Sequence, residues 1–227
     1  MSAEQALEAL RAGMREELTQ RILPFWIERA HDRRRGGTIG FISEDGQADL
    51  AAPKGAILHA RVLWTHSAAF RALGDVAYRV AADQSVVHFV AHFVDPTYGG
   101  VFWTVDAEGR PLDDRKHVYA QAFAIYALAE HHRATGDAHS LRSAIAIHRL
   151  VEAHAHDAVH GGYEEAFARD WTLLDDVRLS DVDLNERKSM NTHLHLLEAY
   201  TTLYTAWPDA RLAERLRELV ELVLDRM

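Results

Sequence analysis

The sequence predicts an all-α fold in which helical hairpins stack in two layers. Apolar residues return every three to four positions along most of the chain, which is the pattern of amphipathic helices. Three Gly-Gly pairs interrupt these patterns at an almost constant interval, at Gly36-Gly37, Gly99-Gly100 and Gly161-Gly162. A repeat of this length with one hairpin per unit indicates an array in which each hairpin packs on the next.

Seven helices are expected, at about residues 3–23, 54–73, 75–94, 116–135, 137–156, 188–206 and 209–226. Three of the joints between them are very short and contain Gly74-Asp75, Gly136-Asp137 and Pro208-Asp209. Glycine can cap the end of one helix, proline stops a helix, and aspartate caps the start of the next. Such tight joints predict antiparallel neighbours.

The other connections are long loops, each with one Gly-Gly pair near its start. An aromatic and β-branched stretch follows each pair, then polar turn residues, and then a lysine that opens the next helical pattern: Lys54, Lys116 or Lys188. We therefore expect short β-hairpin-like loops at one end of the array, and expect function to collect at that end.

The apolar patterns also assign the layers. The helices after the first two long loops, 54–73 and 116–135, carry apolar residues on several faces and are predicted to form an inner layer. Helices 75–94, 137–156 and 209–226 have a polar stripe, as expected for an outer layer with one face in water.

Composition excludes several classes of function. With 34 acidic and 25 basic residues the net charge is -9, which disfavours binding to nucleic acid. The absence of cysteine excludes disulfides, thiolate metal ligands and a thiol nucleophile. The first residues lack the apolar core of a signal peptide, and no apolar run approaches the ~20 residues that cross a bilayer. We expect a cytoplasmic protein with no membrane partner.

Five stretches resemble, in order and at the expected separations, successive blocks of the N-acylglucosamine 2-epimerase family. They are LTQRILPFWIE, PKGAILHARVLWTHSAAFRAL, GGVFWTVDAEGRPLDDRKHVYAQAFAIYALAEHHRATGD, GGYEEAFARDW and KSMNTHLHLLEAYTTLY. The resemblance implies an (α/α)6 barrel, a toroid of six helical hairpins around a central active site. Residues 1–227 would then be the N-terminal part of one such domain, with about its first seven helices.

The resemblance also implies the activity, an isomerase reaction at C2 of the reducing-end sugar of a disaccharide. Cellobiose, for example, would become glucosyl-mannose through ring opening and an enediolate, without a cofactor. The family's two proton-transferring histidines belong to the second half of the barrel, so we expect little activity from this chain alone. The last helical pattern reaches Met227 without a cap, and the open inner face predicts either a missing second half or self-association.

Two residues are predicted to be catalytic. Arg61 lies where the family places an essential arginine, and its guanidinium could hold O1 and O2 of the sugar as negative charge develops. His195 could move a proton between the ring oxygen and O1 during ring opening. The alternatives are an arginine paired with a loop carboxylate and a histidine satisfied in the core.

Asn191 and Tyr119 are predicted to bind substrate. Asn191 and His195 are four residues apart, so on a helix they share a face, and the family motif has this spacing. His193 is two residues from His195 and should point nearly the opposite way. Tyr119 matches a position that lines the family's cavity, where its hydroxyl could bind a sugar oxygen; the alternative is a core tyrosine.

Two other groups of side chains suggest different chemistries. His88 and His92 have the spacing of two metal ligands on a helix, but the carboxylate partner of such motifs is missing and the helix is expected in the outer layer, so no metal site is predicted. Glu164, Glu165 and Asp170 could suggest a glycoside hydrolase, which needs two carboxylates across a bond. A non-catalytic sugar-binding half ring is a further alternative.

Overall fold

Seven α-helices, joined mostly as hairpins, dominate the computed structural model, which describes residues 2–178, 182 and 184–226. They are α1 (Ala3–Glu17), α2 (Ala56–Leu73), α3 (Val76–Phe93), α4 (Val118–Thr135), α5 (Ala138–His154), α6 (Met190–Ala206) and α7 (Ala210–Arg226). All seven predicted helices are therefore confirmed. The first differs in form, because after Glu17 the chain continues through two π-helical turns, Leu18–Ile22 and Phe25–Arg29.

The short joints are capped as predicted. Gly74 and Gly136 end α2 and α4 in the left-handed conformation, with φ of 75° and 76°. Asp75 accepts a hydrogen bond from the backbone N–H of Ala77, and Asp137 caps α5 in the same way. These caps hold α2 against α3 and α4 against α5 as antiparallel pairs.

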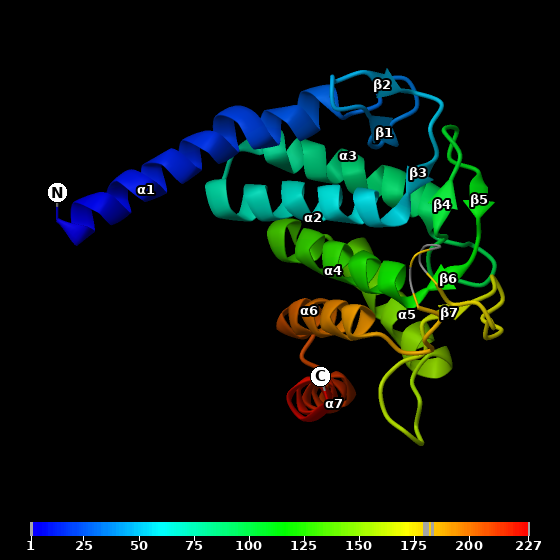
Figure 1. Ribbon diagram of the computed structural model, residues 1–227. Coiled ribbons are helices and arrows are strands. Elements are labelled where there is room, and N and C mark those ends of the chain that lie inside the picture. Colours follow the sequence, from blue (N-terminus) through cyan, green and yellow to red (C-terminus); the bar gives the residue numbers. More distant parts are fainter. Residues whose placement is uncertain (1, 179–181, 183, 227) are drawn as a thin grey trace.

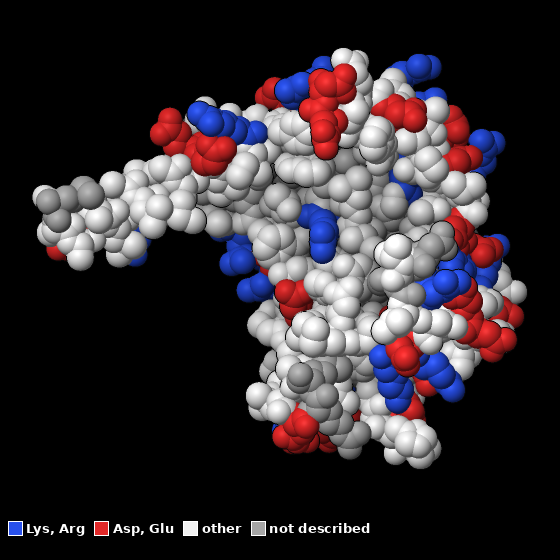
Figure 2. Space-filling model, viewed as in Figure 1, with Lys and Arg blue, Asp and Glu red and all other residues white. Residues whose placement is uncertain are grey.

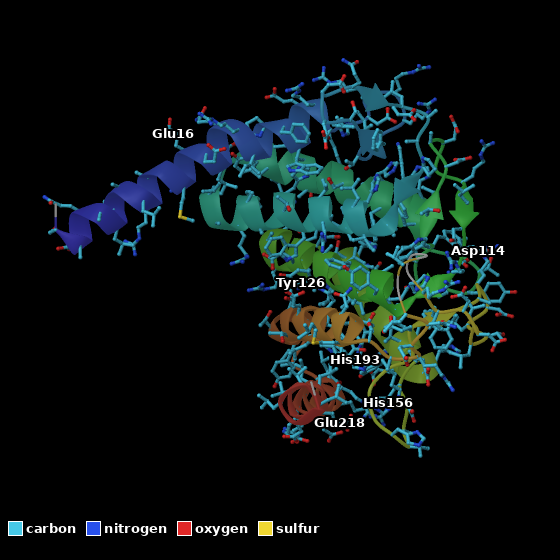
Figure 3. All side chains as sticks on the ribbon, in the orientation of Figure 1. Glu16, Asp114, Tyr126, His156, His193 and Glu218 are labelled. Atoms are coloured by element: carbon cyan, nitrogen blue, oxygen red, sulfur yellow. The ribbon has the colours of Figure 1, made fainter. Side chains whose placement is uncertain are left out.

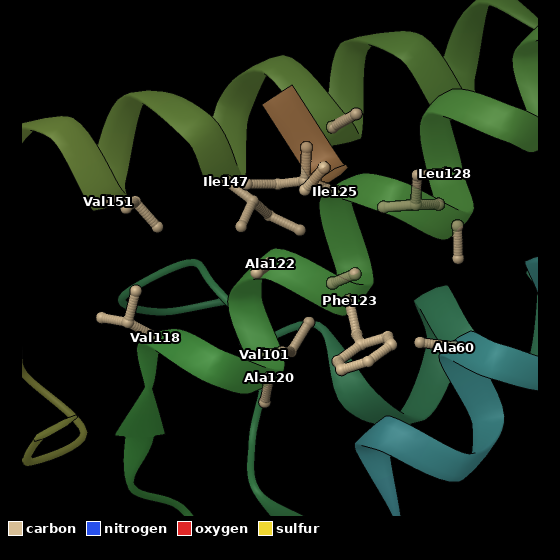
Figure 4. Packing of buried hydrophobic residues seen from close by; sticks show 14 of the residues in the cluster. Ala60, Val101, Val118, Ala120, Ala122, Phe123, Ile125, Leu128, Ile147 and Val151 are labelled. Carbon is tan, nitrogen blue, oxygen red and sulfur yellow. The ribbon is translucent and has the colours of Figure 1, made fainter. Parts of the chain in front are cut away.

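The predicted layers are confirmed. Helices α2, α4 and α6 lie side by side, while α3 and α5 lie behind them and α7 flanks α6 (Figure 1). The core is centred on α4, and Figure 4 shows Phe123 and Ile125 of this helix packed between Ala60 of α2 and Ile147 of α5. By contrast, α1 projects from the body and buries none of its residues. Among the described residues, none of the helices combines the length and apolar character needed to cross a membrane.

Short antiparallel strands join neighbouring long loops. The strands are β1 (Phe41–Ile42), β2 (Ala48–Asp49), β3 (Lys54–Gly55), β4 (Thr104–Val105), β5 (Pro111–Asp113), β6 (Lys116–His117) and β7 (Ala166–Phe167). In the first loop β1 pairs with β2, whereas β3 pairs with β4 of the second loop and β6 with β7 of the third. Because Lys54 and Lys116 belong to strands, α2 and α4 begin two residues later than predicted.

Each Gly-Gly pair is bound to the start of the next inner helix by three side chains, which we call the clasp. A clasp consists of an aspartate before the glycines, the lysine before the helix, and a histidine or glutamine five residues after that lysine. The three clasps are Asp32–Lys54–His59, Asp95–Lys116–Gln121 and Asp157–Lys188–His193.

The third member of each clasp explains the second glycine of each pair. His59, Gln121 and His193 accept the backbone N–H of the residue after the glycines, at 3.0, 2.7 and 2.9 Å. A Cβ on Gly162 would lie 2.6 Å from the imidazole of His193, and φ of this residue is 76°. Only glycine combines this backbone conformation with so close an approach.

The lysine and aspartate of the first two clasps form buried ion pairs. In the first, Nζ of Lys54 lies 3.0 Å from a carboxylate oxygen of Asp32, and both side chains are only 1% exposed. Burial opposes ionisation of Asp32, but hydrogen bonds from Lys54 and from backbone N–H groups bring its pKa below the usual value. In the second, Asp95 binds Lys116 at 2.9 Å and also binds Arg169 at 2.9 Å.

Lys54→Met should destabilise the protein by about 3–5 kcal/mol, because it leaves the buried carboxylate of Asp32 without a cation. Lys116→Met should cost less, since Arg169 still pairs with Asp95. Urea unfolding of the two variants measures both free energies. An equal or larger loss for Lys116→Met would contradict this account of the clasps.

His59→Gln should weaken the pH dependence of stability between about pH 6.5 and pH 4. Burial lowers the pKa of His59 to about 4, so as the pH falls below 6.5 the unfolded chain gains a proton that the folded chain does not, and stability is lost. Glutamine fills the same position in the second clasp, so the variant should fold and reduce this slope by about 1.4 kcal/mol per pH unit. Urea unfolding at several pH values measures the slope, and His139→Gln, at an exposed position, should leave it unchanged.

Candidate active site

The predicted site residues occupy equivalent positions in three repeats. Counted from the clasp lysine, the third, seventh and tenth positions lie on one side of each inner helix. The third holds Ile57, Tyr119 and Asn191, the seventh Arg61, Phe123 and His195, and the tenth Trp64, Tyr126 and Glu198. We call this side the inner face. Tyr126, labelled in Figure 3, stacks on Trp64 with 5.2 Å between ring centroids, which joins the inner faces of α2 and α4.

Three of the four predicted residues meet around Phe123, which sequence analysis missed. The guanidinium carbon of Arg61 lies 4.6 Å from the centroid of the Phe123 ring. The His195 ring lies 4.6 Å from the same centroid, and Tyr119 meets His195 edge-on at 4.9 Å. Phe123 is 5% exposed, whereas Arg61 is exposed and Tyr119 and His195 are half-buried. In this group the guanidinium of Arg61, the imidazole of His195 and the phenol of Tyr119 therefore surround the Phe123 ring.

Among the described residues no carboxylate forms an ion pair with Arg61, and its guanidinium lies over the face of Phe123. A guanidinium is weakly hydrated and packs well on an aromatic face. Charged side chains gather toward the loop side of the molecule, whereas the surface over α2 and α4 is mainly uncharged (Figure 2). An anion that formed beside Phe123 would lie next to the guanidinium of Arg61.

Asn191 has different surroundings. It is exposed in the first turn of α6, one turn before His195, as their spacing predicted. It lines a cavity of about 300 Å³ together with Glu165, Lys188 and Ser189. The structure thus places Asn191 beside the third long loop, at the loop end of the inner face.

His193 and His195 point to different sides of α6, which confirms that prediction. His193 is 1% exposed and lies at the loop end of the helix (Figure 3). Its Nε2 accepts the N–H of Tyr163 and its Nδ1 donates to the carbonyl of Ser189. Burial lowers the pKa of His193. His193 therefore anchors the third long loop, whereas His195 lies on the inner face.

The three carboxylates that suggested a glycoside hydrolase all accept hydrogen bonds from neighbouring residues of the fold. Glu164 forms two hydrogen bonds with Arg187, at 2.8 and 2.9 Å. Glu165 is buried at the start of α6, where it accepts hydrogen bonds from Ser189 and Thr192; burial raises its pKa. Asp170 accepts the backbone N–H of Thr172. These contacts favour structural roles for all three carboxylates.

His88 and His92, whose spacing suggested metal ligands, pack against neighbouring histidine rings. His88 lies between His59 and His92, with ring centroids 5.4 and 4.5 Å apart, and Nδ1 of His92 lies 3.3 Å from the carbonyl oxygen of Gly109. Within the described ranges, no group of three or more histidine, aspartate or glutamate side chains has the arrangement of a metal site.

Comparison with known proteins agrees with the resemblance drawn from the motifs. A family model described as N-acylglucosamine 2-epimerase matches residues 37–227. The cellobiose 2-epimerase of Bacteroides fragilis is 47% identical over 220 residues, or 97% of this chain and 56% of that protein. The cellobiose 2-epimerase of Ruminococcus albus is 42% identical over 90% of this chain and 52% of its own length.

A solved structure extends the comparison to the fold. The cellobiose 2-epimerase of Bacillus thermoamylovorans matches with a TM-score of 0.93 and 38% identity, over 96% of this chain and 56% of that one. The match confirms the predicted α/α toroid architecture. The chain spans about half the length of the curated relatives it matches.

Phe123→Leu should release Arg61 from its fixed position at a stability cost of about 1–3 kcal/mol. In the wild type the ring current of Phe123 should shift the side-chain proton signals of Arg61 in NMR spectra, and this shift should vanish in the variant. Phe89→Leu is the matched control, because Phe89 is fully buried and packs on Phe93. It should lower stability but leave the Arg61 signals in place; the opposite pattern would show that Arg61 does not lie on Phe123.

Proposed function

The chain belongs to the N-acylglucosamine 2-epimerase family, and from this premise we propose that it holds the reducing end of a disaccharide in a carbohydrate 2-epimerase. The observation that carries the proposal is the group of Arg61, Tyr119 and His195 around Phe123. A permanent cation, an imidazole and a phenol hydroxyl suit a site that opens a sugar ring and stabilises an enediolate.

The proposed reaction inverts C2 of the reducing-end sugar, for example between cellobiose and glucosyl-mannose, without a cofactor. Ring opening moves the O1 proton to the ring oxygen and leaves an aldehyde at C1. Loss of the C2 proton then forms an enediolate, and return of a proton to the opposite face of C2 gives the epimer. His195 carries the proton in the first step, and Arg61 stabilises the charge on O1 and O2 in the second. Tyr119 and Asn191 hydrogen-bond the sugar.

In the family that this chain resembles, two histidines transfer the proton at C2. These histidines belong to the half of the toroid that these 227 residues do not match. We therefore propose that this chain supplies binding, ring opening and charge stabilisation, and that it turns over little substrate alone. The prediction that it is the N-terminal part of a single domain belongs to the same proposal. Self-association through the open inner face and a cytoplasmic location remain predictions.

Two alternatives make different predictions for the same sugar. A non-catalytic binding module would bind cellobiose and leave its C2 proton unexchanged even when the complete toroid is present. A glycoside hydrolase would release glucose from cellobiose, but the contacts of Glu164 and Glu165 argue against this activity.

Calorimetry should detect cellobiose binding to this chain, and NMR in D2O should show little deuterium entering C2. Arg61→Met should weaken binding about 10- to 100-fold, because it removes hydrogen bonds from a charged group. Arg142→Met, at an exposed position on the outer helix α5, should bind as the wild type does. Rapid formation of the mannose-ended product would contradict the division of labour, and equal binding by both variants would contradict the site.

A further inference from the structure

Three of the histidines on the inner helices, His59, His193 and His195, can be compared by the contacts of their ring nitrogens. In His59 and His193, Nδ1 lies 2.9 and 2.6 Å from the backbone carbonyl four residues earlier, and Nε2 accepts a backbone N–H. Both rings are thus saturated by the backbone. In His195, Nδ1 instead lies 2.7 Å from a carboxylate oxygen of Glu198. Within the residues described, Nε2 of His195 forms no hydrogen bond.

We propose that Glu198 is the positioning residue of His195. An ionised carboxylate has no proton to donate, so the 2.7 Å contact requires the hydrogen of the neutral ring to be on Nδ1. This leaves the lone pair of Nε2 free. Glu198 thereby selects Nε2 as the nitrogen that His195 presents, and the use of this nitrogen toward a sugar rests on the function proposed above.

Two aromatic side chains also contact the His195 ring. Tyr119 meets it edge-on, at an interplanar angle of 88°, and the Phe123 ring lies 4.6 Å away at 42°. These aromatic contacts restrict the tilt of the imidazole but do not distinguish its two nitrogens. Only the contact with Glu198 makes that distinction, because it is a hydrogen bond to one of them.

The surroundings of Glu198 argue against a role in holding the fold. Its side chain is 53% exposed and pairs with His195. Exposed ion pairs contribute little to stability. It occupies the tenth position of the inner face, so it reaches His195 along the same side of α6 without disturbing the clasp.

The selected nitrogen has a defined task in ring opening. Nε2 accepts the proton of the sugar O1–H, the C1–O5 bond breaks as the C1 carbonyl forms, and the same proton passes from Nε2 to O5. The imidazole is neutral before and after the step, and no other reactant is consumed. While the ring carries the proton, the carboxylate of Glu198 stabilises the imidazolium.

The tautomer of His195 can be observed without any turnover. Ring nitrogen–proton correlation spectra of the 15N-labelled chain, recorded at a pH where the imidazole is neutral, show which nitrogen carries the hydrogen; His195→Gln identifies the signals by their loss. We expect Nδ1–H in the wild type. Glu198→Gln should keep it, because the amide oxygen still accepts, whereas Glu198→Leu should lose it in favour of Nε2–H. Glu221→Gln, at an exposed position on α7, is the control and should match the wild type.

The outcomes separate this inference from the proposed function. Nε2–H in the wild type, or Nδ1–H unchanged in Glu198→Leu, would overturn the role of Glu198 whatever the chain binds. Failure of cellobiose binding with the expected tautomers would overturn the sugar site alone, leaving Glu198 as the residue that orients His195. Circular dichroism of Glu198→Leu should match the wild type, so that a change of tautomer is not a change of fold.

Discussion

The ion pair between a lysine and an aspartate at the base of each long loop is the constraint on which the other features depend. In the first two clasps both charges are removed from water, and each would be costly without the other. A loop therefore cannot separate from the start of its inner helix without exposing or stranding a charge. Because the lysine stands directly before the helix, the clasp also fixes where the third, seventh and tenth positions point.

The architecture was predictable from the sequence because it depends on local patterns. Apolar periodicity and the caps at Gly74-Asp75 and Gly136-Asp137 identify the helices, and the same periodicity separates His193 from His195. The role of Lys54 was not predictable, since a lysine at a helix start is ordinarily solvated and its partner Asp32 is distant in sequence. The family resemblance, rather than any local pattern, singled out Arg61.

Phe123 and Glu198 show why part of the site escaped prediction. Phe123 stands in a helix that is apolar on several sides, so its sequence context is that of any core residue, and the neighbours that make it distinctive lie on α2 and α6. Glu198 is an exposed glutamate of an ordinary kind, and the feature that sets it apart is the rotamer that brings it to His195. Both roles come from tertiary contacts and become visible only when the helices are assembled.

The clasp residues and the predicted site residues lie on different sides of each inner helix. The clasp lysine and the residue five places after it face the loops, whereas the third, seventh and tenth positions face inward. A substitution at an inward position leaves the attachment of that helix intact, and the repeat already carries arginine, phenylalanine and histidine at the seventh position. Such a scaffold separates the side chains that line the inner face from those that fix the loops, so one inward side chain at a time can be exchanged without removing a clasp contact.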